Sequence, residues 1–134
     1  MDYHVKYLGN LRNESTHLRS GNSIITDAPV DNHGKGEAFS PTDLASVSLA
    51  NCMMTIVAIA ADTRNLVIES MEAEVKKEMA SNPRRISAIH VRLRITGQFT
   101  DKEKTILHHA ALTCPVALSL HPDVNQNIEV AFAE

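Results

Sequence analysis

The residues with the clearest capacity for chemistry in this sequence are its two cysteines, Cys52 and Cys114. A thiolate is a nucleophile and can be oxidised reversibly, so two thiols that meet in the fold could form a redox pair. A spacing of 62 positions excludes a C-x-x-C motif or a zinc knuckle. Free cysteine is also among the most buried residue types, so inert packing is the alternative. The residue pattern alone leaves both interpretations open.

Cys52 lies within a long apolar segment, residues 44–61, which predicts a central helix that is buried on most sides. Ser40 is a good N-cap, Pro41 suits the first helical position, and Asp43 can complete a capping box. A negative charge at Asp43 is also favoured by the helix dipole. The start of this helix is therefore well defined by the sequence.

The two cysteines are expected in different local environments. Cys52 shares a mildly polar stripe with Ser48 and Thr55, at helical spacings of four and three residues. It lies in mid-helix, so its thiolate needs a nearby cation. Cys114 precedes Pro115 and is expected to cap a short helix, where the dipole favours a thiolate.

Alternation of apolar and polar residues predicts strands on both sides of the central helix. The predicted strands are residues 3–7, 11–19, 23–26, 66–79, 86–99 and 128–132. The strands at 66–79 and 86–99 form a long antiparallel hairpin with one face in water. A capping-box pattern at residues 100–103 opens a second helix. This order predicts one α+β domain spanning residues 1–134.

Composition and charge exclude several function classes. The net charge is −3, with acids and bases interspersed, and Trp is absent, so we expect no nucleic-acid partner. The N-terminus lacks the pattern of a signal peptide. Residues 44–61 approach membrane length but include four polar residues, so we expect a buried helix and no membrane partner. We therefore predict a cytoplasmic protein, with its cysteines in a reducing compartment.

The histidines do not predict a metal site. The sequence holds seven, but none has H-x-x-x-H or H-E-x-x-H spacing. His108 and His109 are adjacent on the second helix, so their side chains point about 100° apart. We expect no metal ion and no cofactor.

Three segments together resemble the two cysteine motifs of the OsmC/Ohr family. They are Ser40–Leu44, Ala50–Met53 and Ala111–Val116, and the hairpin between them also resembles that family. The resemblance covers most of the chain. It implies an OsmC-like α+β fold with an antiparallel sheet, a buried central helix and a second helix. It also implies an intertwined homodimer with two redox sites at the interface.

The same resemblance implies an activity, namely that of a thiol peroxidase for organic hydroperoxides in oxidative stress. Cys52 matches the cysteine that attacks the peroxide as a thiolate and becomes a sulfenic acid. Cys114 matches the cysteine that resolves this acid as a disulfide, which an external dithiol then reduces. These steps agree with the oxidation chemistry expected of a thiolate beside a resolving partner.

One position departs from the family pattern. In active peroxidases of the family a Glu follows the helix-opening proline and, with an Arg, orients the thiolate. This chain has Thr42 there, and the acid is one residue later, at Asp43, where capping also explains it. Arg19, in the predicted N-terminal hairpin, is the candidate cation, and a solvated surface charge is the alternative.

This departure keeps a second function class open. The same dimer could act as a non-catalytic binding module for a small apolar or thiol-bearing ligand, or as a structural dimer with inert thiols. An apolar wall beside Cys52 could favour alkyl peroxides, although core packing explains its members equally well. The residues of this wall would be Met53, Met54, Ile56 and Leu118.

Overall fold

The computed structural model describes residues 1–134, which form two compact units, residues 1–45 and 46–134. The first unit contains the N-terminal strands and the start of the central helix. The second contains the rest of this helix, a second sheet and two further helices. The single domain expected over residues 1–134 stays a prediction.

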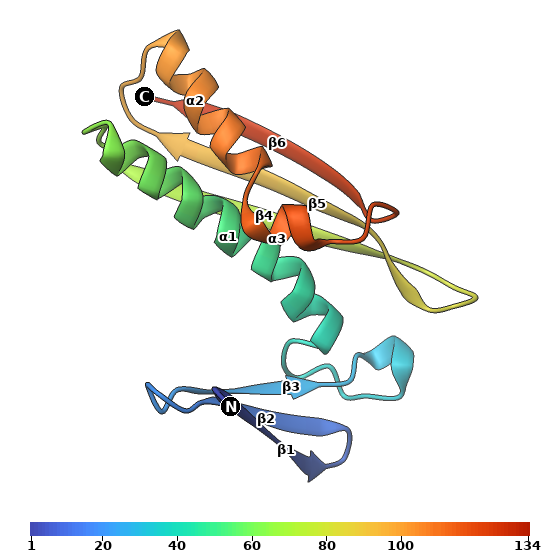
Figure 1. The fold of residues 1–134 in the computed structure, drawn as a ribbon. Helices are drawn as coiled ribbons and strands as arrows, with labels where there is room; N and C mark the ends of the chain where they lie inside the picture. The colour runs from blue at the N-terminus through green and yellow to red at the C-terminus, as the bar shows by residue number, and fades with distance from the viewer. The chain divides into compact units, whose positions relative to one another are not determined.

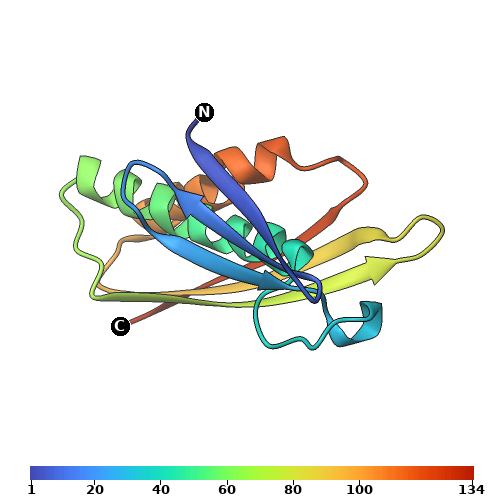
Figure 2. The ribbon, with the colours of Figure 1, turned by 90° about the horizontal axis from the view of Figure 1, so that it is seen from below.

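The first unit is a three-stranded antiparallel sheet with the strand order β1-β2-β3 (Figure 2). Its strands are β1 (Tyr3–Gly9), β2 (Arg12–His17) and β3 (Ser23–Asp27). The segment after β3 contains a short 3-10 helix, η1 (Val30–Asn32), and otherwise connects β3 to the central helix. The predicted strands at residues 3–7, 11–19 and 23–26 are thereby confirmed.

The strand β1 is more exposed than its alternating pattern predicted. The apolar side chains of Tyr3, Val5 and Tyr7 are 67, 62 and 61% exposed, so the expected half-buried strand is wrong for the isolated chain. The alternation predicts which residues share a face. It does not say whether another layer covers that face.

The central helix α1 (Pro41–Thr63) begins at the predicted residue. The Ser40 Oγ accepts a hydrogen bond from the Asp43 N–H at 3.0 Å, and the Asp43 carboxylate accepts one from the Ser40 N–H at 2.9 Å. This reciprocal pair satisfies two backbone donors that a helix start otherwise leaves free. The predicted capping box is confirmed.

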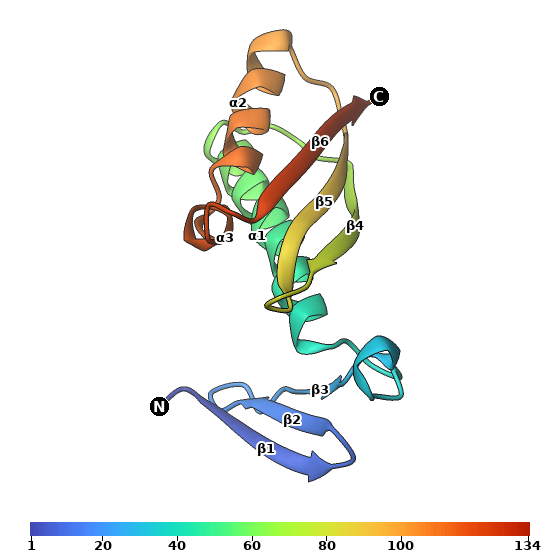
Figure 3. The same ribbon diagram turned by 90° about the vertical axis from the view of Figure 1, so that its right-hand side faces the viewer.

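The second unit places α1 and α2 on the same face of a three-stranded sheet (Figures 1 and 3). Its further elements are β4 (Ser70–Ala80), β5 (Arg85–Thr96), α2 (Asp101–Leu112), α3 (Pro115–Ser119) and β6 (Asn125–Ala133). The capping box of α2 is present, because Thr100 and Glu103 bond each other's backbone N–H groups at 3.2 and 2.7 Å. The α+β class is confirmed.

The sheet of the second unit is mixed. The strands β4 and β5 form the long antiparallel hairpin that the sequence predicted. The strand β6 pairs with the other edge of β5 in parallel, from Ala88 with Asn125 to Thr96 with Ala133. After β5 the chain passes through α2 and α3 and returns to the end of the sheet where β5 begins. A parallel pair of strands requires such a crossover connection.

The core of the second unit lies between α1, α2 and the inner face of β5. On α1 the residues Leu49, Met53 and Val57 are fully buried at four-residue spacing. On β5 the buried residues are Ile89, Val91, Leu93 and Ile95, and on α2 they are Leu107 and Ala111. Each of α1, α2 and β5 therefore packs into the core with one face.

The expectation that the central helix is buried on most sides is wrong for the isolated chain. Asn51 and Thr55 are exposed, and Ile59 is 55% exposed. The sheet and α2 cover one side of the helix, and an apolar helix needs further layers to be buried all round. By length and composition alone α1 could cross a membrane, a property that core helices of soluble proteins share.

Candidate redox site

The structure brings Cys52 and Cys114 together. Cys52 is a half-buried residue of α1, and Cys114 is 0% exposed at the junction of α2 and α3. Both belong to the apolar core of the second unit. Cys52 lies close enough to Cys114 to raise the pKa of the Cys114 thiol. Two residues that are remote in sequence are therefore neighbours in the fold.

Cys114 takes the place that the sequence predicted for it. Thr113 ends α2, Pro115 is the first residue of α3, and Cys114 is the N-cap between them. The Cys114 Sγ accepts a hydrogen bond from the Ala117 N–H at 3.5 Å. This bond holds the sulfur at the start of α3 and gives one of the free amide groups there an acceptor.

Burial raises the pKa of the Cys114 thiol above its ordinary value of 9.0. The Ala117 N–H opposes this rise, whereas the Cys52 thiol raises the pKa of Cys114 further. The start of α3 favours a thiolate at Cys114, as expected, but burial has the larger effect on the pKa. Removing the charged sulfur from water costs more free energy than the hydrogen bonds from two backbone N–H groups return. At neutral pH Cys114 is a protonated thiol.

The polar stripe around Cys52 is weaker than predicted. The Thr55 hydroxyl is exposed and donates its hydrogen bond to the Asn51 carbonyl at 2.9 Å, so it is used within the helix. Of the predicted apolar wall, Met53 is fully buried in the core and Leu118 is 73% exposed. The apolar wall beside Cys52 stays a prediction.

The remaining predicted site residues belong to the first unit. Arg19 is exposed in the turn between β2 and β3. The Thr42 hydroxyl lies 3.2 Å from the Ser40 hydroxyl, and the Asp43 carboxylate caps α1. The capping role of Asp43 is confirmed, whereas the roles of all three at the cysteines stay predictions.

An ion pair between Arg12 and Asp27 in the first unit was not predicted from the sequence. The Asp27 side chain is fully buried, and its Oδ2 lies 3.8 Å from the Arg12 Nε and accepts the Glu37 N–H at 3.1 Å. The Asp27 Oδ1 and the Arg12 Nε have no hydrogen-bond partner. Because Arg12 and Asp27 face each other across β2 and β3, the register of this hairpin was the signal that could have found them.

The sequence analysis also missed Gln126, whose side-chain amide donates to the Ala117 carbonyl at 2.9 Å. Gln126 lies in β6 on the same face as Ile128, Val130 and Phe132. A glutamine at the start of this apolar alternation was a usable signal, because a polar side chain on a core-facing position needs a partner.

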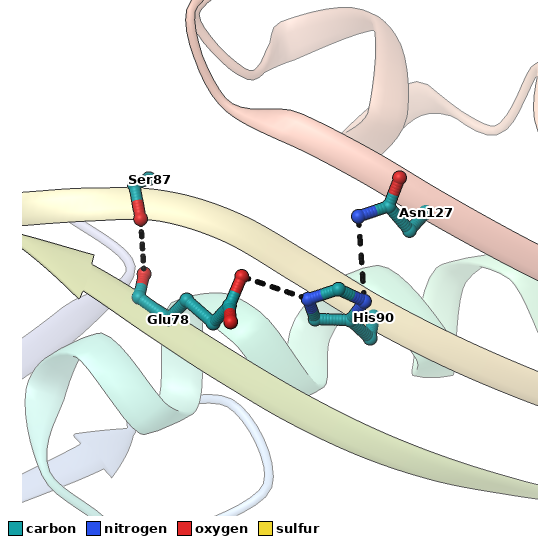
Figure 4. A network of polar contacts seen from close by, with 4 residues as sticks. All are labelled: Glu78, Ser87, His90 and Asn127. Atoms are coloured by element: carbon teal, nitrogen blue, oxygen red, sulfur yellow. Dashed lines mark hydrogen bonds and ion pairs between the residues drawn. The ribbon is translucent and has the colours of Figure 1, made fainter.

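A hollow of the second unit is lined by residues other than the two cysteines. It measures about 770 Å³ and lies over the outer face of β4, β5 and β6. One of its lining residues is His90, which lies 2.9 Å from the Glu78 carboxylate and 3.3 Å from the Asn127 amide (Figure 4). The hydrogen bond and the charge of His90 lower the pKa of Glu78.

No three His, Cys, Asp or Glu side chains gather closely enough to hold a metal ion.

Comparison with known families agrees with this arrangement. The family model described as OsmC-like protein matches residues 34–129, which include both cysteines. No curated protein matches the chain.

Solved structures share the fold. A protein from Psychrobacter arcticus 273-4, proposed to be an osmotic stress induced and detoxification response protein, is 50% identical. That similarity covers 97% of this chain and 95% of the other, with a TM-score of 0.92. An OsmC-like protein from Mycoplasma pneumoniae is 16% identical over 99% of this chain and 96% of its own, with a TM-score of 0.82. An organic hydroperoxide resistance protein OsmC from Legionella pneumophila is 15% identical over 96 and 94%, with a TM-score of 0.76.

Proposed function

The chain belongs to the OsmC-like family, and on this basis we propose that it is a thiol-dependent peroxidase for organic hydroperoxides. Cys52 is the attacking thiolate and Cys114 is the resolving thiol. The observation that supports this proposal most is the proximity of the two thiols, which come from separate helices. A disulfide requires two sulfurs that can approach to about 2 Å.

In the first step the Cys52 thiolate attacks one oxygen of the hydroperoxide. The O–O bond breaks, the alkoxide takes up a proton and leaves as an alcohol, and Cys52 becomes a sulfenic acid. The half-buried position of Cys52 is consistent with this step, since the sulfur must meet a peroxide. Cys114 is fully buried and is consistent with the second step only.

In the second step the Cys114 sulfur attacks the Cys52 sulfenic acid. The S–O bond breaks, the thiol proton of Cys114 joins the departing hydroxide as water, and a disulfide forms. An external dithiol then reduces this disulfide by two thiol exchanges and is itself oxidised to a disulfide. The sum is one hydroperoxide and one dithiol converted to an alcohol, water and a disulfide.

The raised pKa of Cys114 agrees with this division of roles. A protonated Cys114 can donate a hydrogen bond to a Cys52 thiolate and does not compete with it for the peroxide. Once Cys52 is a sulfenic acid, the proton of Cys114 is needed to release water. The two thiols thus need different protonation states.

The proposal includes a homodimer in the cytoplasm. Its support in this chain is the unburied apolar surface of Tyr3, Val5 and Tyr7 on β1 and of Ile59 on α1, which a second copy could cover. Arg19 is the proposed cation that stabilises the Cys52 thiolate, and Thr42 with Asp43 stands where the family has its Glu.

The first experiment is thiol counting and intact mass before and after one equivalent of cumene hydroperoxide. Wild type, Cys52→Ser and Cys114→Ser are compared. We expect wild type to lose two thiols and two mass units, and a sulfenic acid to be trapped only in Cys114→Ser. Two thiols that survive the peroxide unchanged would refute the peroxidase and favour the binding module.

The cation is tested with the two arginines of the first unit. Arg19→Ala should slow the reaction of Cys52 with the peroxide, because a thiolate in mid-helix needs a nearby positive charge. Arg12→Ala is the matched comparison. If Arg12→Ala slows the peroxide reaction and Arg19→Ala does not, the cation was assigned to the wrong residue.

A further inference from the structure

A relay of two hydrogen bonds connects β6 to the Cys114 sulfur. The Gln126 Nε2 donates to the Ala117 carbonyl at 2.9 Å. The N–H of the same residue, Ala117, donates to the Cys114 Sγ at 3.5 Å. Both bonds therefore involve the backbone of one residue of the short helix α3, the first through its carbonyl and the second through its N–H.

Two side chains of this segment, Val116 and Ala117, pack against the core but are only partly buried. The helix α3 comprises five residues, none of them buried, and follows Pro115 directly after the end of α2. So short a helix is not stable by itself. A side chain from the sheet that bonds its backbone can decide where its first turn lies.

We propose that Gln126 is a positioning residue that holds the Ala117 N–H against the Cys114 sulfur through the Ala117 carbonyl. The functional part of this proposal rests on the proposed function, in which Cys114 is the resolving cysteine. Gln126 itself does not touch the sulfur in this arrangement and acts through α3 alone.

The reaction step that needs this N–H is the reduction of the disulfide. A thiolate of the external dithiol attacks the Cys52 sulfur, the bond between the sulfurs of Cys52 and Cys114 breaks, and Cys114 leaves with the electron pair as a thiolate. Cys114 is buried, so this thiolate has little water to stabilise it. The Ala117 N–H supplies a donor where the negative charge develops, and a better stabilised leaving thiolate departs faster.

The pKa of Cys114 should change in opposite directions if Gln126 positions the Ala117 N–H and if it only supports the structure of α3. Burial is the main cause that raises the pKa of Cys114, so a loosened α3 would let water reach the sulfur and lower this pKa. Loss of the Ala117 N–H alone would raise the pKa of Cys114 instead, because that bond favours the thiolate. The sign of the change therefore separates positioning from general support.

The test measures alkylation of Cys114 by iodoacetamide against pH, in full-length chains that carry Cys52→Ser, so that one thiol reacts. Gln126→Met keeps the side-chain length but removes the donor. Gln126→Leu also removes the donor and adds no charge near the sulfur. Gln98→Met, at an exposed glutamine, is the matched control.

We expect both Gln126 variants to shift the alkylation midpoint of Cys114 to higher pH and to slow alkylation at pH 8 about fivefold, the effect of one typical hydrogen bond. The control should not move. A midpoint that is unchanged or moves to lower pH in both Gln126 variants would overturn the proposal. This measurement uses no peroxide, so its outcome is independent of the peroxidase test.

A second readout uses chains with both cysteines, oxidised to the disulfide and then reduced by dithiothreitol. Gln126→Met should slow this reduction about as much as it slows alkylation of Cys114. An equal rate in wild type and Gln126→Met would refute the functional part of the proposal. Failure to form the disulfide at all would instead refute the proposed function.

Discussion

Burial of the Cys114 thiol makes the stability of the fold sensitive to alkaline pH. The folded state holds the thiol proton more tightly than the unfolded chain, whose cysteine titrates at the ordinary value of 9.0. Below pH 9.0 both states are protonated, so the stability contributed by the neutral thiol is fully present. As the pH rises through the raised pKa, the unfolded chain loses its proton first, and the free energy of unfolding falls.

The size of this effect follows from the linkage of one proton. Between pH 9.0 and the raised pKa of folded Cys114, the free energy of unfolding should fall by up to about 1.4 kcal/mol for each pH unit. Cys114→Ala removes the titrating group. It also removes a fully buried sulfur and the acceptor of the Ala117 N–H, at a cost of about 2 kcal/mol at pH 7.

The measurement is urea unfolding of wild type and Cys114→Ala from pH 7 to pH 10.5, under a reductant and at one protein concentration. Contributions of groups that do not interact with Cys114 cancel in the difference between the two curves. We expect the advantage of wild type over Cys114→Ala to shrink above pH 9.0. Parallel curves over the whole range would refute the reasoning that burial holds the proton on Cys114.

Three further changes test the packing and electrostatics of the second unit. Thr100→Ala should cost about 1 kcal/mol in urea unfolding, because the Thr100 hydroxyl caps α2 by accepting the Glu103 N–H. Leu93→Ala, at a fully buried position of β5, should cost about 2–5 kcal/mol in the same assay. His90→Gln should return the pKa of Glu78 toward 4.5, measured by NMR titration of the carboxyl carbon, because His90 is the main cause of the lowered value.

Each of these changes has a control or a contradicting result. The control for Thr100→Ala is Lys102→Ala in the first turn of α2, and the control for Leu93→Ala is Arg94→Ala on the outer face of β5. Each control should change the free energy of unfolding by no more than about 0.5 kcal/mol. Equal losses in the control and the test variant would contradict the assigned role. For Glu78 the ion pair stabilises the fold above pH 4.5 and is lost as the pH falls through the lowered pKa. An unchanged titration of Glu78 in His90→Gln would exclude this contact in solution.

The order of the elements and the starts of the two long helices could be predicted from the sequence. The Ser40 and Thr100 capping boxes mark the starts of both long helices, because they are local hydrogen-bond patterns among residues three apart. Cys114 was expected as the cap of a short helix for a similar local reason, since Pro115 cannot continue the preceding helix. Local steric and hydrogen-bonding rules leave few alternatives at such positions.

The exposure of apolar faces could not be predicted in the same way. The alternation in β1 and the apolar run in α1 indicate which residues share a face, but Val5 and Ile59 are exposed in this chain. Whether a face is covered depends on which other elements, or other copies, pack on it. The parallel pairing of β6 with β5 is of the same kind, because it depends on where the connection returns the chain.

The sequence by itself determined the elements, the capping of both helices and the positions of two thiols in motifs of a known family. Only the tertiary structure decided the environment of the thiols. It brings Cys52 beside Cys114, buries Cys114 so that desolvation outweighs the amide groups of α3, and adds Gln126 behind Ala117. The reason is that a pKa and a relay of hydrogen bonds depend on distances between residues far apart in the chain.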